Sequence, residues 1–246
     1  MRDITLKELL EAGCHFGHQA NRWHPKAGGF IFGERDGVHV IDLAKTKAGL
    51  VAAAEYLKNL AANGGTVVFV GTKRQAKIIV EEAAKKAMFY HVLERWPGGL
   101  LTNFDIIKKN NLDAIVKLEK DLLSDSQAFA TKKEKLLAQR KLDKNKKSYG
   151  GLVGLTKTPD AIFLVDIKKE DGALREALRT NTTVVAITDT NTNPEAVKYG
   201  IPANDDAIGS IKIIIDYLAD AWIEGIKFNK TNNPTPISND QNSIPN

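Results

Sequence analysis

Three runs of apolar, mostly β-branched residues constrain the fold of this chain more than any other feature. They are "TVVFV" (66–70), "DAIFLVD" (160–166) and "TVVAITD" (183–189). A continuous apolar run, without alternation, is typical of a strand that is covered on both faces of a parallel sheet. Segments with helical spacing follow each run, and "HVLE" (91–94) adds a short strand. This alternation predicts an α/β domain with a doubly wound parallel sheet and right-handed crossovers.

Local signals predict further elements before the first of these strands. Thr5 and Glu8 form a capping-box pattern that begins a short helix, and Gly13 ends it. Asp36-Gly37 lies between two apolar runs and predicts a tight turn. Asp42 is placed to cap an alanine-rich helix that extends to about residue 62. A long helix is expected near the C-terminus, from about 206 to 228.

Residues 95–159 interrupt the strand–helix alternation. From Asn103 the apolar residues follow helical spacing, Ser124–Ser126 break the pattern, and Thr131 with Glu134 forms a second capping box. Two helices with a narrow apolar seam predict a protruding, antiparallel coiled-coil hairpin. We therefore expect a discontinuous α/β domain with an N-terminal helical extension (1–102 and 150–228), an inserted helical hairpin (103–149) and a disordered polar tail (229–246).

Positive charge is concentrated in this insertion. Residues 106–149 contain twelve Lys or Arg and six Asp or Glu, a surplus that exceeds the net charge of +5 of the whole chain. Such an asymmetry favours binding of a polyanion, although a lysine-rich helical face exposed to solvent has the same composition. The single cysteine and the lack of a targeting or membrane-spanning pattern indicate a reducing compartment, the cytoplasm, and no membrane partner.

The predicted strand ends offer several readings. "GTKRQ" (71–75) could hold a phosphate of a nucleotide or of RNA through Lys73 and Arg74, or form an ordinary strand–helix turn. Asp166 and Asp189 could bind Mg²⁺ in a phosphotransfer site, although capping of the following helices is the simpler role. Cys14 is interpreted as a buried structural thiol, because no nucleophilic constellation surrounds it.

Histidine and carboxylate side chains suggest a possible zinc site. His15 and His18 are three residues apart, and a leading segment could pack against the strand ends. His18 with Asp189, Asp205 and Asp206 then offers nitrogen and oxygen ligands. No cofactor is otherwise required by any pattern in the chain.

Two loops combine an arginine, a tryptophan and a proline. "NRWHPK" (21–26) and "ERWPGGLLTNF" (94–104) place flat aromatic and cationic faces on stiff backbone, and Gly98-Gly99 allows close approach. These features fit docking against structured RNA. The alternative is that Trp23 and Trp96 are core residues.

Six stretches together resemble the bacterial-type small-subunit ribosomal protein S-two family over about residues 4–228. They are "TLKELLEAGCHFGHQANRWHPK", "FIFGERDGVHVIDLAKT", "FVGTKRQA", "ERWPGGLLTNF", "PDAIFLVDIKKE" and "IPANDDA". The resemblance implies a flavodoxin-like fold and a structural component of the small ribosomal subunit without catalytic activity. It further implies contacts with 16S-type ribosomal RNA and with neighbouring ribosomal proteins, participation in subunit assembly, and recruitment of the large protein S-one. A bacterial and an organellar ribosome both remain open.

The resemblance assigns RNA contacts to the cationic and loop residues already singled out. These are Arg22, Trp23, Lys26, Lys73, Arg74, Arg95, Trp96, Gly98, Gly99, Thr102, Asn103, Lys108, Lys109, Lys132, Lys133, Lys146 and Lys147. The alternatives are an α/β phosphotransfer enzyme that uses Asp166 or Asp189, and a nucleotide-binding module that uses "GTKR". No small-molecule substrate is expected under the first reading.

Overall fold

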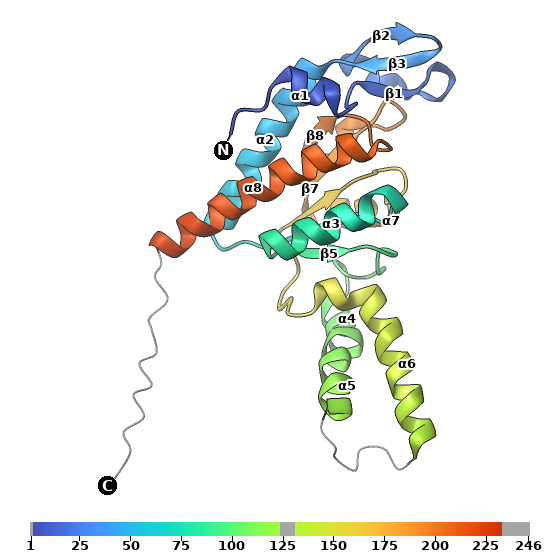
Figure 1. Cartoon of the computed structure of the whole chain (residues 1–246), viewed down its shortest axis with the longest axis vertical. Helices are drawn as coiled ribbons and strands as arrows, with labels where there is room; N and C mark the ends of the chain where they lie inside the picture. Colours follow the sequence, from blue (N-terminus) through green and yellow to red (C-terminus); the bar gives the residue numbers. More distant parts are fainter. Residues whose placement is uncertain (1, 124–130, 233–246) are drawn as a thin grey trace.

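The computed structural model describes residues 2–123 and 131–232. A parallel sheet with helices on both faces forms the body, a small antiparallel sheet lies at one end, and two helices project from the other (Figure 1). The fold is therefore α/β, as the apolar runs predict, and flavodoxin-like, as the family resemblance implies.

Five parallel strands form the central sheet in the order β5-β4-β6-β7-β8. Their bounds are β4 Val67–Val70, β5 Tyr90–Val92, β6 Ala161–Leu164, β7 Thr183–Thr188 and β8 Tyr199–Pro202. Strand β8 has no counterpart in the sequence-based prediction, because Gly200 and Pro202 are residues that seldom occur inside strands. It pairs as an edge strand with β7, where a proline is tolerated.

Both faces of the sheet are buried. Val67, Phe69 and Phe163 pack with α2 (Leu43–Ala62), α3 (Arg74–Ala87) and α8 (Ile208–Asn232) on one face. Val68 and Ile162 pack on the opposite face with α7 (Asp171–Arg179) and with the segment that follows β5. Burial on alternate faces explains why these strands carry no polar alternation.

Helix α8 extends farther than its sequence pattern suggests. Its last turns include residues 229–232, which the prediction assigned to a disordered tail. Asn229 Nδ2 donates a hydrogen bond to the carbonyl oxygen of Ala62, 2.8 Å away, at the C-terminal end of α2. This contact holds the polar end of α8 on the body, a tertiary effect that composition does not reveal. Residues 233–246, the rest of the predicted tail, lie outside the described residues.

The N-terminal segment forms α1 (Leu6–Glu11) and a three-stranded antiparallel sheet in the order β1-β3-β2. Thr5 and Glu8 make both hydrogen bonds of the predicted capping box. Strands β2 (Ile31–Arg35) and β3 (Val38–Ile41) meet at Asp36 and Gly37, whose φ angles of 53° and 76° match the predicted tight turn. Strand β1 (Phe16–Gln19) was not predicted.

The projecting helices follow β5 and Trp96. They comprise α4 (Phe104–Ile107), a π-helical segment (Lys108–Leu112), α5 (Asp113–Leu123) and α6 (Lys132–Tyr149). Thr131 and Glu134 form the second predicted capping box. Helices α5 and α6 lie side by side (Figure 1), and Lys146 Nζ is 2.5 Å from Glu119 Oε1. The predicted break at Ser124–Ser126 lies outside the described residues, so the complete hairpin stays a prediction.

Within the described residues, short 3₁₀ helices occupy four connections: Ala20–Arg22, Pro25–Phe30, Gly150–Leu152 and Pro194–Ala196. None of the helices described for this chain has the length and apolar character that crossing a bilayer requires.

Candidate RNA-binding surface and metal site

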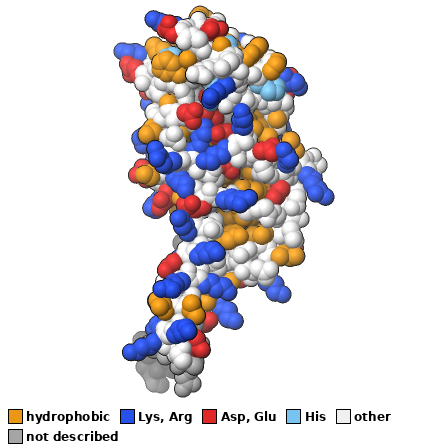
Figure 2. Space-filling model, turned by 90° about the vertical axis from the view of Figure 1, so that its right-hand side faces the viewer, with side chains coloured by type: hydrophobic (Ala, Val, Ile, Leu, Met, Phe, Trp, Pro, Cys, Tyr) orange, Lys and Arg blue, Asp and Glu red, His pale blue; other side chains and the backbone are white. Residues whose placement is uncertain are grey.

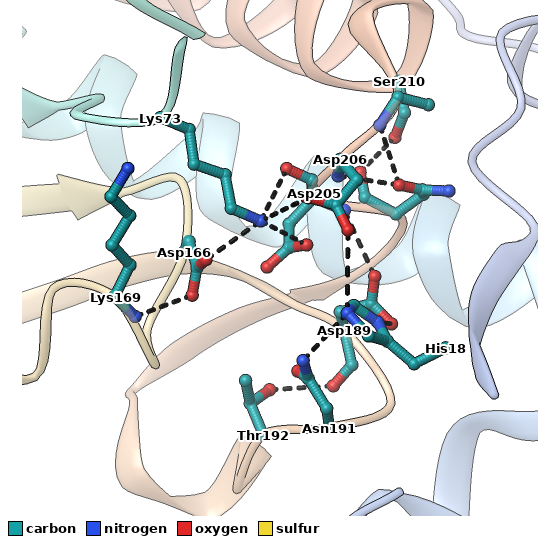
Figure 3. Close-up of polar contacts among 12 residues, drawn as sticks. His18, Lys73, Asp166, Lys169, Asp189, Asn191, Thr192, Asp205, Asp206 and Ser210 are labelled. Atoms are coloured by element: carbon teal, nitrogen blue, oxygen red, sulfur yellow. Dashed lines mark hydrogen bonds and ion pairs between the residues drawn. The ribbon is translucent and has the colours of Figure 1, made fainter. Parts of the chain in front are cut away.

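Four acidic residues and one lysine meet at the carboxyl edge of the parallel sheet (Figure 3). Lys73 follows β4, Asp166 follows β6, Asp189 follows β7, and Asp205 with Asp206 follows β8. Parallel strands end at a common edge, so side chains that are far apart in sequence come together there. The prediction that the strand ends carry the polar chemistry of the body is consistent with this arrangement.

Lys73 is enclosed by carboxylates. Its Nζ is 2.7 Å from Asp205 Oδ1, 2.8 Å from Asp206 Oδ1 and 2.9 Å from Asp166 Oδ2. Burial by itself lowers the pKa of Lys73, but the carboxylates, with Asp205 first, outweigh burial and raise it well above its usual range. Only 12% of the side chain is exposed.

The prediction that Lys73 contacts RNA is therefore corrected. The ammonium group of Lys73 forms ion pairs within the chain and is not available to a phosphate. Its partners lie on loops more than ninety residues farther along the sequence, so the sequence around Lys73 does not reveal them. Arg74, the next residue, is exposed on the first turn of α3 and remains a candidate.

His18 reaches the same edge from β1. Its Nδ1 is 3.0 Å from Asp189 Oδ1, and its backbone N–H donates to Thr190 Oγ1 at 2.8 Å. A hydrogen bond with Asp189 raises the pKa of His18, burial opposes this, and the charges of Asp205 and Asp206 add to the increase. The close approach of β1 depends on Gly17, where a Cβ atom would lie 2.6 Å from Thr190 Cγ2.

Three of the four predicted metal ligands meet. One ligand atom each of His18, Asp189 and Asp205 lies within 4.8 Å of the others. The Oδ2 atom of Asp205 is buried and has no hydrogen-bond partner among the described residues. One imidazole and two carboxylates are a donor set that suits Zn²⁺ with one position left for water. The residues present therefore fit a metal ion.

Asp206 does not belong to this group. Its Oδ1 pairs with Lys73, and its Oδ2 lies 3.6 Å from His18 Nε2, the ring nitrogen that faces away from Asp189. The metal prediction is corrected on this point: Asp206 helps to hold Lys73 and borders His18. His15 lies apart, and its ring contacts that of Phe16 at an interplanar angle of 38°, with the centroids 4.0 Å apart.

Asp166 does not cap α7, whose N-cap is Glu170, so the predicted capping role is corrected. Besides its contact with Lys73, its Oδ1 accepts a hydrogen bond from the backbone N–H of Lys169 at 2.9 Å. It thus stabilises the turn between β6 and α7.

The loop with Trp96 is held inward. Trp96 is 8% exposed and packs in the core cluster beneath α7, so the prediction that its flat ring face docks on RNA is corrected. The backbone N–H groups of Gly99 and Leu101 donate to the carboxylate of Glu176 at 2.6 and 3.1 Å. A carboxylate of the chain itself therefore accepts the hydrogen bond of the backbone N–H of Gly99, one of the predicted RNA contacts.

The remaining loop candidates are on the surface. Arg22, Arg95, Thr102 and Asn103 are exposed, as is Gly98. Trp23 is 43% exposed and its ring lies 5.6 Å from that of His39. Lys26 forms an ion pair with Glu195, so it offers less to a phosphate than its position in the sequence suggests.

Lysine and arginine side chains line the projecting helices (Figure 2). Helix α6 contains eight cations and two acids. Two of the cations have acidic neighbours, Lys146 with Glu119 and Lys147 with Glu94 at 3.8 Å. The other six form no ion pair within residues 2–123 and 131–232; they are Lys132, Lys133, Lys135, Arg140, Lys141 and Lys144. Lys109 on the π-helical segment is exposed and Lys108 is partly exposed.

Comparison with known proteins identifies this combination of a flavodoxin-like body and cationic helices. Residues 9–225 match the family described as "Ribosomal protein S2". The chain is 47% identical over 227 residues to "Small ribosomal subunit protein uS2" of Dictyoglomus thermophilum. The aligned region covers 92% of this chain and 91% of that protein. The protein of the same name from Rhizobium meliloti is 45% identical over 91% of this chain and 87% of its own length. The chain belongs to the ribosomal protein S2 family.

Membership in the S2 family settles the class of function. The chain is a structural component of the small subunit of a ribosome, within an RNA–protein complex, and not an enzyme. The phosphotransfer and nucleotide-binding alternatives built on Asp166, Asp189 and "GTKR" are thereby set aside, and Lys73 and Asp166 are explained by the ion-pair network.

Sequence reasoning overlooked two acidic residues of α7 and the turn before it. Glu176 holds the 96–101 loop, and Glu170 accepts a hydrogen bond from the Thr72 hydroxyl. Neither has a local signal, because each meets its partner across more than seventy residues of sequence.

Proposed function

We propose that this chain binds 16S-type ribosomal RNA chiefly through α6. The supporting observation is the row of six cations on that helix that have no acidic partner within the described residues. A cation that is paired with an acidic side chain of the same chain contributes little to the binding of a polyanion. A solvent-exposed, unpaired cation, by contrast, displaces counterions from the phosphates that it contacts, which favours binding. Arg22, Trp23, Arg74 and Arg95 add exposed contacts on the body.

The salt dependence of RNA binding tests this proposal. The variant with Lys132, Lys133, Arg140 and Lys141 all changed to Gln should bind small-subunit RNA more weakly. A plot of log affinity against log salt should become shallower by about 3 to 4 units. The control carries Gln at Lys7, Lys85, Lys212 and Lys227, which removes the same charge from helices of the body. Equal salt slopes for the two variants would refute the assignment to α6.

We further propose that the chain contacts neighbouring ribosomal proteins, including S-one, and takes part in subunit assembly in the cytoplasm. An apolar hollow between α1 and the antiparallel sheet supports a protein contact, with Leu10, Phe16 and Phe32 in its lining. Phe32 is 80%, Phe16 52% and Leu10 51% exposed, and a contiguous exposed apolar patch marks an interaction surface. Phe32→Ser should reduce the amount of S-one that cosediments with small subunits, while the chain itself remains bound. Unchanged retention of S-one would contradict this role.

A metal ion is a second candidate property, favoured by the unpartnered Oδ2 of Asp205. When bound, Zn²⁺ would neutralise the excess of carboxylates and join β1 to the loops after β7 and β8. Thermal denaturation with added zinc tests this: a ligand at 100 times its dissociation constant stabilises by about 2.7 kcal/mol. His18→Ala should abolish the increase, whereas His24→Ala, outside the group, should preserve it. No shift in the unaltered chain would end the proposal.

A further inference from the structure

A cavity of about 560 Å³ opens at the carboxyl edge of the sheet, beside the Lys73 network. Thr72, after β4, lines one side, and Lys169 and Glu170, after β6, line the other. The chain leaves these adjacent strands in opposite directions, because α3 leads to β5 and α7 leads to β7 at the other side of the sheet. Open α/β sheets bind ligands at such a switch point, in cavities of about 300–1,000 Å³.

The inner wall combines a carboxylate and an indole N–H. Glu170 is 5% exposed, and one of its oxygens accepts a hydrogen bond from Thr72 Oγ1. Burial raises the pKa of Glu170, and the hydrogen bond from Thr72 opposes the increase. Trp96 lines the same cavity, and its Nε1 is buried without a hydrogen-bond partner among the described residues. A buried polar atom without a partner is unfavourable, so an acceptor supplied by a ligand would stabilise the site.

Cations lie at the mouth. Arg95 and Lys169 are both exposed, and Arg95 forms no ion pair within the part of the chain that the structure describes. The other two acids of the lining are already occupied. Glu94 Oε1 is 2.9 Å from a lysine Nζ of α3, and Glu176 accepts the two loop amides. The opening therefore suits an anionic group, whereas the interior suits a neutral group with hydrogen-bond donors.

We propose that this cavity binds one unpaired guanine nucleotide of the small-subunit RNA. Guanine has two donors, N1–H and N2–H, next to the acceptor O6 on a single edge. Glu170 accepts from the donors, Trp96 Nε1 donates to an acceptor of the base, and Arg95 with Lys169 meets the phosphate. Proteins read unpaired RNA bases through such edges. This inference rests on the proposed RNA-binding function and names the group that is recognised.

Binding of guanosine 5′-monophosphate to the full chain tests the chemistry. The indole N–H signal of Trp96, assigned by its loss in Trp96→Phe, should shift in a nitrogen-15 NMR titration. Glu170→Gln keeps an acceptor for Thr72 but removes the charge, and should weaken affinity about 10-fold or more. Adenosine 5′-monophosphate, which lacks the N1–H donor, should also bind about 10-fold more weakly. Glu82→Gln on α3, exposed and outside the cavity, should bind like the unaltered chain.

Arg95→Gln provides a second variant on an exposed position, in case Glu170→Gln fails to fold. It should weaken binding of the monophosphate but not of guanosine without phosphate. Equal affinity for the two monophosphates, or affinity that is insensitive to both substitutions, would overturn the proposal.

Chemical probing of assembled subunits tests the source of the guanine. Kethoxal reacts with N1 and N2 of unpaired guanines. One guanine should be protected in subunits that contain the unaltered chain or Glu82→Gln, and should become reactive with Glu170→Gln. All three chains should cosediment with small subunits. Binding of the free monophosphate without any such guanine would overturn the assignment to RNA. Failure of every chain to cosediment would instead refute the broader RNA-binding function.

Discussion

Replacement of Lys73 by methionine is the most direct test of the ion-pair network. The substitution preserves the length of the side chain but removes an ammonium that three carboxylate oxygens approach within 2.9 Å. Asp205 is then left buried beside Asp166 and Asp189 without the ammonium that offsets their repulsion. Removing one partner of a buried ion pair costs about 3–5 kcal/mol. At about 2–4 °C per kcal/mol, the midpoint of thermal unfolding should fall by about 6–20 °C.

The loss should depend on pH. Burial, followed by the charges of Asp189 and Asp166, raises the pKa of Asp205 to about 7 against an ordinary value of 3.8, and Lys73 opposes this increase. Without Lys73 the pKa of Asp205 rises further. A carboxyl group with a raised pKa in the folded state takes up a proton on folding, so the free energy of unfolding increases as the pH falls through that pKa. The penalty of Lys73→Met should therefore be largest near pH 8 and smaller near pH 5.

Urea denaturation at both pH values measures these differences. Lys85→Met is the matched control, because Lys85 lies on α3, the helix that Lys73 precedes, in an exposed pair with Glu81, 2.7 Å away. Its loss should cost less than about 1 kcal/mol. A cost for Lys73→Met no larger than that of the control would show that the carboxylates do not depend on the ammonium. A penalty that grows toward pH 5 would refute the assignment to unpaired carboxylates.

Two glycines should respond to alanine with opposite signs. Gly225→Ala should destabilise by about 1–3 kcal/mol in urea denaturation, because a Cβ atom would lie 2.2 Å from the carbonyl oxygen of Lys58 where α8 crosses α2. Gly172→Ala on α7 has no atom within 4 Å of its added Cβ and should stabilise by about 0.4–1 kcal/mol; a loss in that variant would contradict the packing. Thr131→Ala should cost about 0.5–2 kcal/mol of helix stability and speed hydrogen exchange in the first turn of α6, with unchanged exchange counting against the capping box.

Local patterns predicted the elements whose signals are contained in a few residues. The apolar runs of β4, β6 and β7 and the caps at Thr5, Asp42 and Thr131 each act over neighbouring positions. The same reasoning failed for β1 and β8, which are short and contain glycine or proline. These strands form because each pairs with a neighbouring strand, β1 with β3 and β8 with β7, and no local pattern in the sequence reveals that neighbour.

In the candidate site, too, some contacts could be predicted from the sequence and others could not. The meeting of His18 with Asp189 and Asp205 follows the hypothesis that the leading segment packs against the strand ends, where ligand-binding groups of a parallel sheet gather. The burial of Lys73 was not predictable, because the local sequence of a lysine before a helix is the same whether the ammonium binds a phosphate or a carboxylate. The hydrogen bond from the backbone N–H of Gly99 to Glu176 was not predictable from the local sequence either.

From its sequence alone, the chain's α/β class, its helix caps, its family resemblance and its cationic insertion could be inferred, since each depends on composition or on short-range order. Tertiary structure alone decided which charges face outward. Lys73 and Trp96 turned inward and the unpaired cations of α6 stayed exposed, because the energy of a charge or an indole depends on partners brought from distant segments.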